Sequence, residues 1–304
     1  MKISLVGLGG CGKTSIYATT FAAKAPSETK DFAPTVMYEV RRHPYLGLAV
    51  SIFDFGGQMQ YREAYLEKPE IFAETDVLIP VVDLHDVTKF ETAKKYFLEI
   101  MNVFEQAPKK PKVIVFLHKY DTEGTQKAKL EENLKIAKKL FSEALKQWQP
   151  TIQITSIYDQ EKLSIILRDI LVANYENLQQ HVQNAEKQLG EIDAKIIVSD
   201  VSGNVIVHNV AGITSGLQLR GDLRDFISAS NTLRENFFLT DSAVFHGESE
   251  KSEKHLELYV FKFILAVLIM RGKEIDVESE QKIKTLLKDM ALFAELVVSA
   301  HSEK

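Results

Sequence analysis

The sequence contains a single cysteine, Cys11, among its 304 residues. One thiol cannot form an internal disulfide, which agrees with a protein of the reducing cytosol. The chain also lacks any block rich in lysine and arginine, and its formal net charge is −5 at pH 7. Such a chain offers no positive field to a phosphate backbone, so we expect no nucleic-acid partner.

Long hydrophobic runs are missing as well. The nearest candidate, Val260–Met270, is apolar except for Lys262 and is shorter than the ~20 residues that span a bilayer, so a buried strand is the better interpretation. The start, Met1–Gly7, lacks the apolar run of a signal peptide, and the end, Ser302–Lys304, lacks a prenylation cysteine. We expect a cytoplasmic protein without direct membrane insertion, which a partner could recruit to a membrane.

What the chain does have is the composition of a globular protein. Hydrophobic residues make up 45% and charged residues 26% of the sequence, which is enough apolar surface for a core. The length exceeds the ~100–200 residues of one typical domain. A change in pattern near Val172–Asn174 divides the chain into two expected domains, residues 1–173 and 174–304.

Strand and helix signals alternate through the first domain. Apolar runs predict strands at Ile3–Val6, Leu48–Phe53, Val77–Val82, Val113–Leu117 and, more weakly, Ile152–Ile154. Apolar residues at helical spacing predict helices at Thr14–Ala23, Thr88–Phe104, Gln126–Leu145 and Leu163–Ala173. This order is typical of an α/β fold with a mostly parallel sheet. Val36–Arg42 and Leu48–Phe53 flank a turn-like segment, so we expect an antiparallel hairpin and a mixed sheet.

The second domain follows an α+β order without an internal repeat. We expect a polar helix at Asn177–Leu189, a hairpin of Lys195–Ser199 with Asn204–His208, and a helix at about Leu217–Glu235. Strands at Ala243–Phe245 and within Leu256–Met270 surround a charged loop, Gly247–Lys254, before a last helix at Val277–Ser299. No chemical motif marks this half.

The chemistry is concentrated near the N-terminus, in the segment Gly7-Leu8-Gly9-Gly10-Cys11-Gly12-Lys13-Thr14-Ser15. It fits the phosphate-loop pattern G-x-x-x-x-G-K-[ST] and lies between a predicted strand and a predicted helix. The glycines allow backbone N–H groups to face phosphate oxygens, and the start of the helix adds its positive dipole end. Lys13 is expected to reach the β- and γ-phosphates, and Thr14 to bind Mg²⁺. A simple glycine turn would not require Lys-Thr directly after Gly12.

A second motif, Asp54-Phe55-Gly56-Gly57-Gln58, follows the strand Leu48–Phe53. An aspartate at the end of a strand beside a phosphate loop is typical of a carboxylate that holds Mg²⁺. Gly57 can offer its N–H to a γ-phosphate, because glycine lets the backbone approach a ligand closely. We predict that Gln58 is the catalytic residue and orients the attacking water; taken alone, the two glycines would indicate only a turn.

A third motif, His118-Lys119-Tyr120-Asp121, follows the strand Val113–Leu117. A carboxylate at Asp121 can accept from both N1–H and the exocyclic amine of guanine, a donor pair that adenine does not present. We predict that Lys119 lies along the base and braces the phosphate loop. His118 cannot offer the amide pair of an asparagine, so the selection of guanine depends on Asp121.

These motifs together resemble the Rag (Gtr) GTPases, relatives of Ras and Arf that regulate nutrient signalling. The resemblance implies a Ras-like P-loop GTPase domain followed by a roadblock-like domain that dimerises or docks. It also implies that Thr35 covers Mg²⁺ and the γ-phosphate only in the GTP state, and that Ser156 and Ile157 contact the base. Thr14, Thr35 and Asp54 would then be the metal residues.

The resemblance implies a partner as well, a second Rag-like GTPase in a homodimer or heterodimer through residues 174–304, and possibly a roadblock-type scaffold. Arg62 is the nearest candidate for an arginine finger, although its position suggests a solvated helix, so we expect slow hydrolysis until a partner accelerates it. Two alternatives stay open: a P-loop ATPase, and a scaffold that binds nucleotide with little or no turnover.

Overall fold

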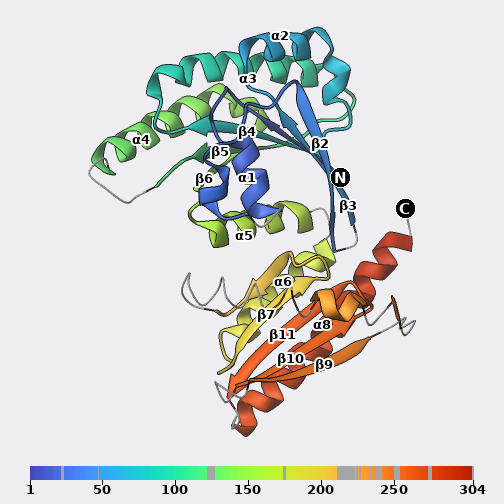
Figure 1. Cartoon of the computed structure of the whole chain (residues 1–304). Helices are drawn as coiled ribbons and strands as arrows, with labels where there is room; N and C mark the ends of the chain where they lie inside the picture. Colours follow the sequence, from blue (N-terminus) through green and yellow to red (C-terminus); the bar gives the residue numbers. More distant parts are fainter. Residues whose placement is uncertain are drawn as a thin grey trace. The chain divides into compact units, whose positions relative to one another are not determined.

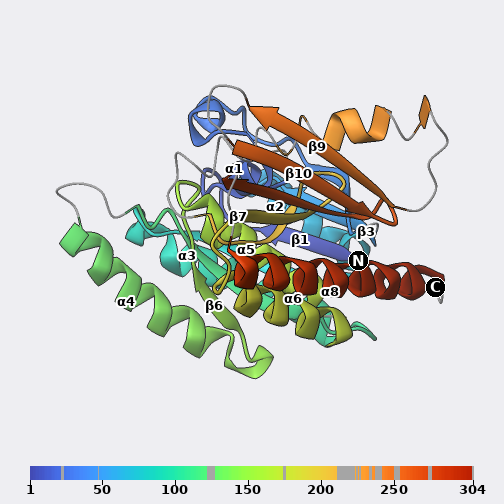
Figure 2. The ribbon, with the colours of Figure 1, turned by 90° about the horizontal axis from the view of Figure 1, so that it is seen from below.

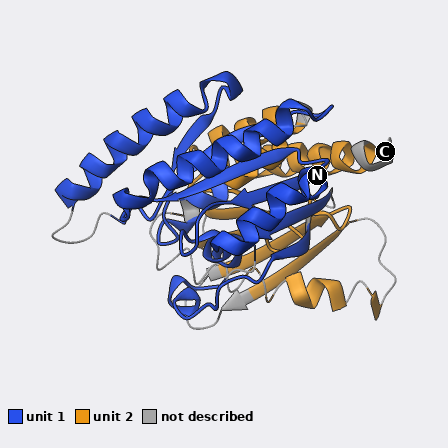
Figure 3. Ribbon diagram, turned by 90° about the horizontal axis from the view of Figure 1, so that it is seen from above, with its two compact units in different colours: residues 1–43, 49–166 blue, residues 44–48, 167–304 orange. Residues whose placement is uncertain are grey.

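The computed structural model describes the chain in two compact units. Unit 1 comprises Met1–His43 with Ala49–Ile166, and unit 2 comprises Pro44–Leu48 with Leu167–Lys304 (Figure 3). The described residues are all except 22–23, 47, 122–126, 174–175, 211–222, 224, 226, 233–234, 237–241, 250–253, 273–275 and 303–304. Domain limits of 1–173 and 174–304 remain our proposal for the functional parts.

Unit 1 is built on a six-stranded sheet in the order β2-β3-β1-β4-β5-β6. The strands are β1 (Lys2–Val6), β2 (Tyr38–Tyr45), β3 (Leu48–Phe55), β4 (Val77–Asp83), β5 (Lys112–His118) and β6 (Thr151–Ile154). Five of them run parallel, because β1 pairs in parallel with β3 and β4, β4 with β5, and β5 with β6. The five strands expected from apolar runs are therefore present, each within two residues of its predicted ends.

Helices cover both faces of this sheet (Figure 1). The elements on one face are α2 (Met59–Glu67), α3 (Phe90–Glu105) and α4 (Lys127–Ala144), and the other face carries α1 (Lys13–Thr20) and the first part of α5 (Gln160–Val172). Short 3-10 turns lie at η1 (Pro26–Thr29), η2 (Pro69–Phe72), η3 (Val87–Lys89) and η4 (Lys146–Trp148). Aromatic side chains fill the core between α3 and the sheet, with Phe55, Phe72, Phe97 and Phe104 fully buried.

Unit 2 contains a five-stranded sheet in the order β8-β7-β11-β10-β9. Its strands are β7 (Lys195–Asp200), β8 (Val205–His208), β9 (Ala243–Ser249), β10 (Lys254–Phe261) and β11 (Leu265–Gly272), and neighbouring strands pair in antiparallel fashion. Helices α6 (Glu176–Leu189) and α8 (Val277–Ser302) pack side by side (Figure 2). The expected α+β order is thus present.

Two details of unit 2 differ from the sequence-based expectation, and a third is largely untested. The apolar stretch Val260–Met270 is divided between β10 and β11, because a turn with positive φ at Lys262 and Phe263 interrupts it. Strand β9 continues to Ser249, since its pairing with β10 extends into the segment expected as a charged loop. The helix expected at 217–235 lies largely outside the described residues, although positions 227–232 are helical.

Among the described residues, no helix combines the length and the apolar character that crossing a bilayer requires.

The tip of the β2–β3 connection belongs to unit 2, where Tyr45 and Leu46 are buried. Asp200 holds this tip, because its carboxylate accepts a hydrogen bond of 3.1 Å from the backbone N–H of Leu46. Burial raises the pKa of Asp200, while hydrogen bonds from Asn204 and Ser202 oppose that shift.

Candidate functional site

A cleft of about 380 Å³ lies in unit 1 at loops that follow the strands of the parallel sheet. Ligands of open parallel sheets bind outside the carboxyl ends of the strands, which is where these loops meet. The cleft brings together most of the predicted site residues: Gly9, Gly10, Gly12, Lys13, Thr14, Ser15, Thr35, Gly57, Gln58, His118, Lys119, Asp121 and Ile157. The remaining four, Gly7, Cys11, Asp54 and Ser156, are not part of its lining.

The phosphate loop connects β1 to α1 through a backbone that only glycine adopts easily. Gly10 has φ of 77° and Gly12 has φ of 97°, both in the left-handed region where a side chain is strained. Gly12 is also the N-cap of α1, so the free N–H groups of the first helical turn follow directly. The loop therefore presents backbone donors at a helix N-terminus, the arrangement that binds anions.

Lys13 is buried at the start of α1, with 5% of the residue exposed. Its ammonium donates to the carbonyl oxygens of Gly7 and Leu8 at 3.0 Å each and lies 3.5 Å from the sulfur of Cys11. Backbone carbonyls of the phosphate loop thus hold the Lys13 ammonium against the loop. The thiol of Cys11 is buried beside this ammonium, and a contact between Cys11 and nucleotide stays a prediction.

Three side-chain oxygens form a cluster beside the phosphate loop. The hydroxyl of Thr14 donates to Oδ2 of Asp54 at 2.6 Å and lies 3.0 Å from the hydroxyl of Thr35, which itself donates to the same Oδ2 at 3.4 Å. Oδ1 of Asp54 is buried without a hydrogen-bond partner. Burial raises the pKa of Asp54, and the Thr14 hydrogen bond and the Lys13 charge oppose this shift.

This cluster fits a magnesium ion, which takes oxygen ligands and is usually bound by one or two carboxylates together with phosphates and water. A buried carboxylate oxygen without a partner is costly, and a cation would remove that cost. No group of three or more histidine, cysteine or acidic side chains forms a complete metal cage within the described part of the chain. The donor set is that of an ion shared with a phosphate ligand.

Two consecutive glycines press the segment after β3 against its neighbours. A Cβ atom on Gly57 would lie 2.3 Å from the backbone of Leu8 and 2.4 Å from that of Gly9, in the phosphate loop. A Cβ on Gly56 would lie 2.4 Å from the carbonyl oxygen of Thr35. The Gly56 N–H also donates to the carbonyl of Met37 at 2.7 Å. Glycine is therefore required by close backbone approach on two sides.

His118 ends β5 as a buried, neutral side chain. Its Nδ1 lies 2.9 Å from the hydroxyl of Thr155, and its ring packs so closely on the phosphate loop that a Cβ on Gly12 would lie 2.7 Å from Cδ2. Burial, assisted by the charge of Lys119, lowers the pKa of His118 to about 3. The ring thus packs against the phosphate loop at Gly12, at the position where the guanine motif has an asparagine amide.

Lys119 connects the loop after β5 to the phosphate loop. Its ammonium donates to the carbonyl of Gly10 at 2.7 Å and to the carboxylate of Asp83, at the end of β4, also at 2.7 Å. The predicted brace is present as a contact. On the following loop, the hydroxyl of Ser156 donates to Asp121 and accepts from the N–H of Tyr158 at 3.0 Å. Asp121 is thereby oriented at the end of the cleft.

Gln58 and Arg62 lie at the start of α2, next to the cleft. Gln58 is the exposed N-cap of this helix and lines the cleft. Arg62, in contrast, is half-buried with its guanidinium 5.1 Å from the ring centroid of Tyr96, and it does not line the cleft. Arg62 thus lies on a largely exposed helix, as expected, although its own side chain packs on Tyr96 of α3.

Nine residues of the lining were not predicted as site residues, and four of them, Ala33, Pro34, Phe55 and Gly56, directly precede the predicted Thr35 and Gly57. Pro26, Thr29, Lys30 and Phe32 come from the segment between α1 and Thr35, and Tyr158 follows Ser156. Of these five, the four residues before Thr35 belong to no recognisable motif. Their position in the chain could have indicated them, since a chain that leads from the phosphate loop to Thr35 has to pass the cleft. In addition, an aromatic residue such as Phe32 suits contact with a planar base.

Comparison with known proteins places this geometry in a family. The model of the Gtr1/RagA G protein conserved region matches residues 2–214. A Ras-related GTP-binding protein A of Dictyostelium discoideum is 28% identical over 247 residues, which cover 79% of this chain and 78% of that protein. GTP-binding protein GTR1 of Saccharomyces cerevisiae is 28% identical over 192 residues, or 61% of each chain.

Two further similarities were found. GTP-binding protein gtr1 of Schizosaccharomyces pombe is 27% identical over 193 residues and 61% of each chain, so this chain spans less than two thirds of either yeast protein. Among solved structures, the Arl6 BBS3 small GTPase of Trypanosoma brucei matches 54% of this chain and 90% of its own, at 20% identity and a TM-score of 0.43.

Proposed function

The chain belongs to the Gtr1/RagA G protein family, and from that premise we propose that the cleft binds GTP and GDP as the two states of a switch. The resemblance drawn from the sequence motifs is confirmed, as is the expected combination of a Ras-like α/β unit with an α+β unit. Membership makes the chain a GTP-binding protein and a GTPase.

The observation that carries the proposal is the meeting of three unlike features in one cleft. A buried lysine on a glycine loop suits phosphate, the Thr14–Thr35–Asp54 oxygen cluster suits a divalent cation, and Asp121 suits the paired donors of guanine. A phosphate site alone would serve either purine nucleotide. The carboxylate at the opposite end selects guanine.

The residues that would hold Mg²⁺ are Thr14 and Asp54, with Thr35 joining only when a γ-phosphate is present. Bound there, the ion would neutralise phosphate charge and orient the terminal phosphate. Thr35 and Gly57 approach the phosphate loop from two different segments of the chain. Loss of the γ-phosphate would remove the ligand that both share, which is the physical basis of an order-to-disorder switch.

For hydrolysis, we propose that Gln58 positions the attacking water from the first turn of α2. Its backbone is fixed by Gly57 against the phosphate loop, whereas its side chain is exposed. No arginine occurs among the described residues that line the cleft, so the charge that develops in the transition state lacks a guanidinium from this set. Turnover should therefore be slow until a partner supplies one.

For unit 2, we propose dimerisation through residues 174–304 with an identical or related GTPase, or docking on a roadblock-type scaffold. Support comes from family membership and from an antiparallel sheet whose edge strands β8 and β9 each have one neighbour in the described structure. We further propose a cytoplasmic protein that a partner recruits to a membrane. Sedimentation of the full chain tests the dimer, and a monomer at high concentration would contradict it.

A direct test of the cleft compares the wild type with Asp54→Asn. Because the Asp54 carboxylate is buried with an orphaned oxygen, the variant should fold with equal or higher stability while losing the increase in GTP affinity that Mg²⁺ causes. Calorimetric titration of GTP with Mg²⁺ and with a chelator measures this. An unchanged effect of Mg²⁺ in the variant would remove Asp54 from the site.

A further inference from the structure

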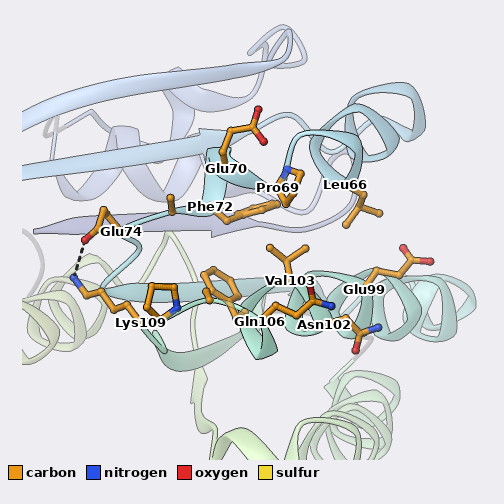
Figure 4. Close-up of a pocket in the computed structure, with 14 residues that line it drawn as sticks. Leu66, Pro69, Glu70, Phe72, Glu74, Glu99, Asn102, Val103, Gln106 and Lys109 are labelled. Carbon is orange, nitrogen blue, oxygen red and sulfur yellow. Dashed lines mark ion pairs between the residues drawn. The ribbon is translucent and has the colours of Figure 1, made fainter.

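A second concave surface of unit 1 shares no lining residue with the nucleotide cleft. This groove has a volume of about 640 Å³ and lies between two walls (Figure 4). One wall is formed by the end of α2 and by η2, and the other by the second half of α3 with the segment 106–109. We refer to it as the α2–α3 groove.

The floor of the α2–α3 groove is apolar. Leu66 and Phe72 contribute from one wall and Val103 from the other (Figure 4), and Ala107 also lines the groove. Phe72 is fully buried, so it supplies a rigid base, whereas Val103 is only half-buried and presents apolar surface to solvent. A groove of this size accepts a few apolar side chains, which is the scale of a helix-in-groove or peptide anchor.

The rim of the groove is acidic. Glu70 and Glu74 stand on the η2 wall and Glu99 on the α3 wall, against one cation, Lys109. That cation is already engaged, since its ammonium lies 2.6 Å from Asp76 and 3.8 Å from Glu74. No ion pair of Glu70 or Glu99 occurs among the described residues. The rim therefore has uncompensated negative charge on both walls.

We propose that the α2–α3 groove is the docking site for a basic amphipathic peptide segment of a partner protein. Its apolar side chains would enter the space over Phe72 and Val103, and its lysine or arginine side chains would pair with Glu70 and Glu99. Apolar contacts supply most of the affinity in such interfaces, and the charged rim selects the partner. An acidic segment is rejected by the same two glutamates.

The groove is mechanically linked to the nucleotide cleft. Its α2 wall belongs to the helix capped by Gln58, and the hydroxyl of Tyr65, next to Leu66, donates a hydrogen bond to the carbonyl of Met37. Met37 in turn accepts from Gly56, so both segments that face the phosphate loop connect to this wall. The affinity of the groove for the peptide should therefore depend on the bound nucleotide. This dependence, unlike the groove itself, rests on the proposed switch.

The test selects binders from a displayed library of random peptides of about 16 residues, long enough for four helical turns. The full chain, loaded with a non-hydrolysable GTP analogue, serves as the target. The enriched peptides should carry apolar residues at helical spacing and at least two basic residues. Synthetic copies of them should bind Val103→Arg at least about tenfold more weakly, as expected when a residue at the centre of an interface is replaced by a bulky charge.

Controls separate the groove from other surfaces. Ile136→Arg, at a 43% exposed position of α4, should leave peptide binding unchanged, and both variants should keep wild-type affinity for GTP. Replacing both acids, Glu70→Gln with Glu99→Gln, should weaken binding about threefold or more and reduce its dependence on salt.

The proposal is overturned if no peptide is enriched, if enriched peptides bind Val103→Arg as well as the wild type, or if they are acidic. Loading with GDP provides a separate readout. Equal binding in both nucleotide states, with the effect of Val103→Arg retained, would leave the groove in place and contradict only the switch.

Discussion

The two sides of the nucleotide cleft are held in different ways. The phosphate loop is fixed from beneath, because Lys13 bonds to its carbonyls, Lys119 ties Gly10 to Asp83, and the His118 ring packs on Gly12. The facing segments, 35–38 and 56–60, carry exposed apolar side chains. The residues Val36 and Met59 are 68% and 67% exposed.

The difference shows how one pocket can serve both binding and switching. A preorganised loop loses little entropy when it takes up phosphate, so it provides affinity in either state. The facing segments are connected to it by few contacts, mainly the Thr14–Thr35 pair and the close approach of Gly57. Few buried contacts mean low local stability, which suits segments that respond to one phosphate group.

The largest effect is expected from a substitution in the phosphate loop, which is the fixed side of the cleft. Lys13→Ala should lower the affinity for both GTP and GDP about 10²- to 10⁴-fold, because charge-assisted hydrogen bonds to phosphate can no longer form. Fluorescent-nucleotide titration measures both affinities. The control Lys138→Ala, at an exposed position of α4 outside the cleft, should leave both affinities unchanged. A variant at Lys13 that still bound GDP tightly would contradict the comparison.

A substitution in the facing segments, 35–38 and 56–60, which form the movable side, should affect GTP and GDP affinity differently. Gly57→Ala forces a methyl group into the backbone of Leu8 and Gly9, so the segment cannot close on the loop. We expect about tenfold or greater loss of affinity for a GTP analogue while GDP binding is largely kept. As a control, Gly190→Ala meets only an ordinary contact of 3.5 Å and should be silent. Equal losses for both nucleotides would show that Gly57 belongs with the fixed side.

A smaller effect is expected for catalysis. Gln58→Leu should lower single-turnover hydrolysis about tenfold with little change in GTP affinity, because the side chain orients water rather than substrate. Gln180, an exposed residue of α6 in unit 2, gives the matched control Gln180→Leu. An unchanged rate would favour a nucleotide-binding scaffold, in which GTP serves structure alone.

The smallest effect concerns pH. His118 has its pKa lowered to about 3 by burial, whereas an unfolded histidine titrates near ~6.5. Between these values the unfolded state binds the proton and the folded state does not, so stability falls as pH decreases through this range. The loss is about 1.4 kcal/mol per pH unit at most. Denaturant unfolding at pH 7 and 5.5 should show it in the wild type, and His118→Asn should reduce it.

The sequence predicted residues on both sides of the cleft but not the long-range contacts that hold them in place. The phosphate loop, Asp54 and Asp121 follow strands and helices that periodicity defines, and their spacing is set by local backbone chemistry. The roles of His118 as a support for Gly12, and of Gly56 as a contact of Thr35, depend on residues distant in the chain. No local pattern encodes such contacts.

The second unit shows the same limit. Hairpin β7–β8 and helices α6 and α8 were evident from turn residues and apolar spacing. The turn inside Val260–Met270 was not, because Lys262 and Phe263 adopt positive φ without a glycine to signal it. Likewise, Tyr45 is buried in unit 2 beside Leu46, whose backbone N–H donates to Asp200, far along the chain.

The selection of guanine tests the account most directly. Competition of GTP, GDP and ATP for the wild type and for Asp121→Asn should be measured with Mg²⁺ present. We predict that ATP binds at least about 100-fold more weakly than GTP to the wild type, and that the variant loses most of its preference, because the carboxylate no longer accepts both guanine donors. Equal binding of ATP and GTP to the wild type would contradict the account.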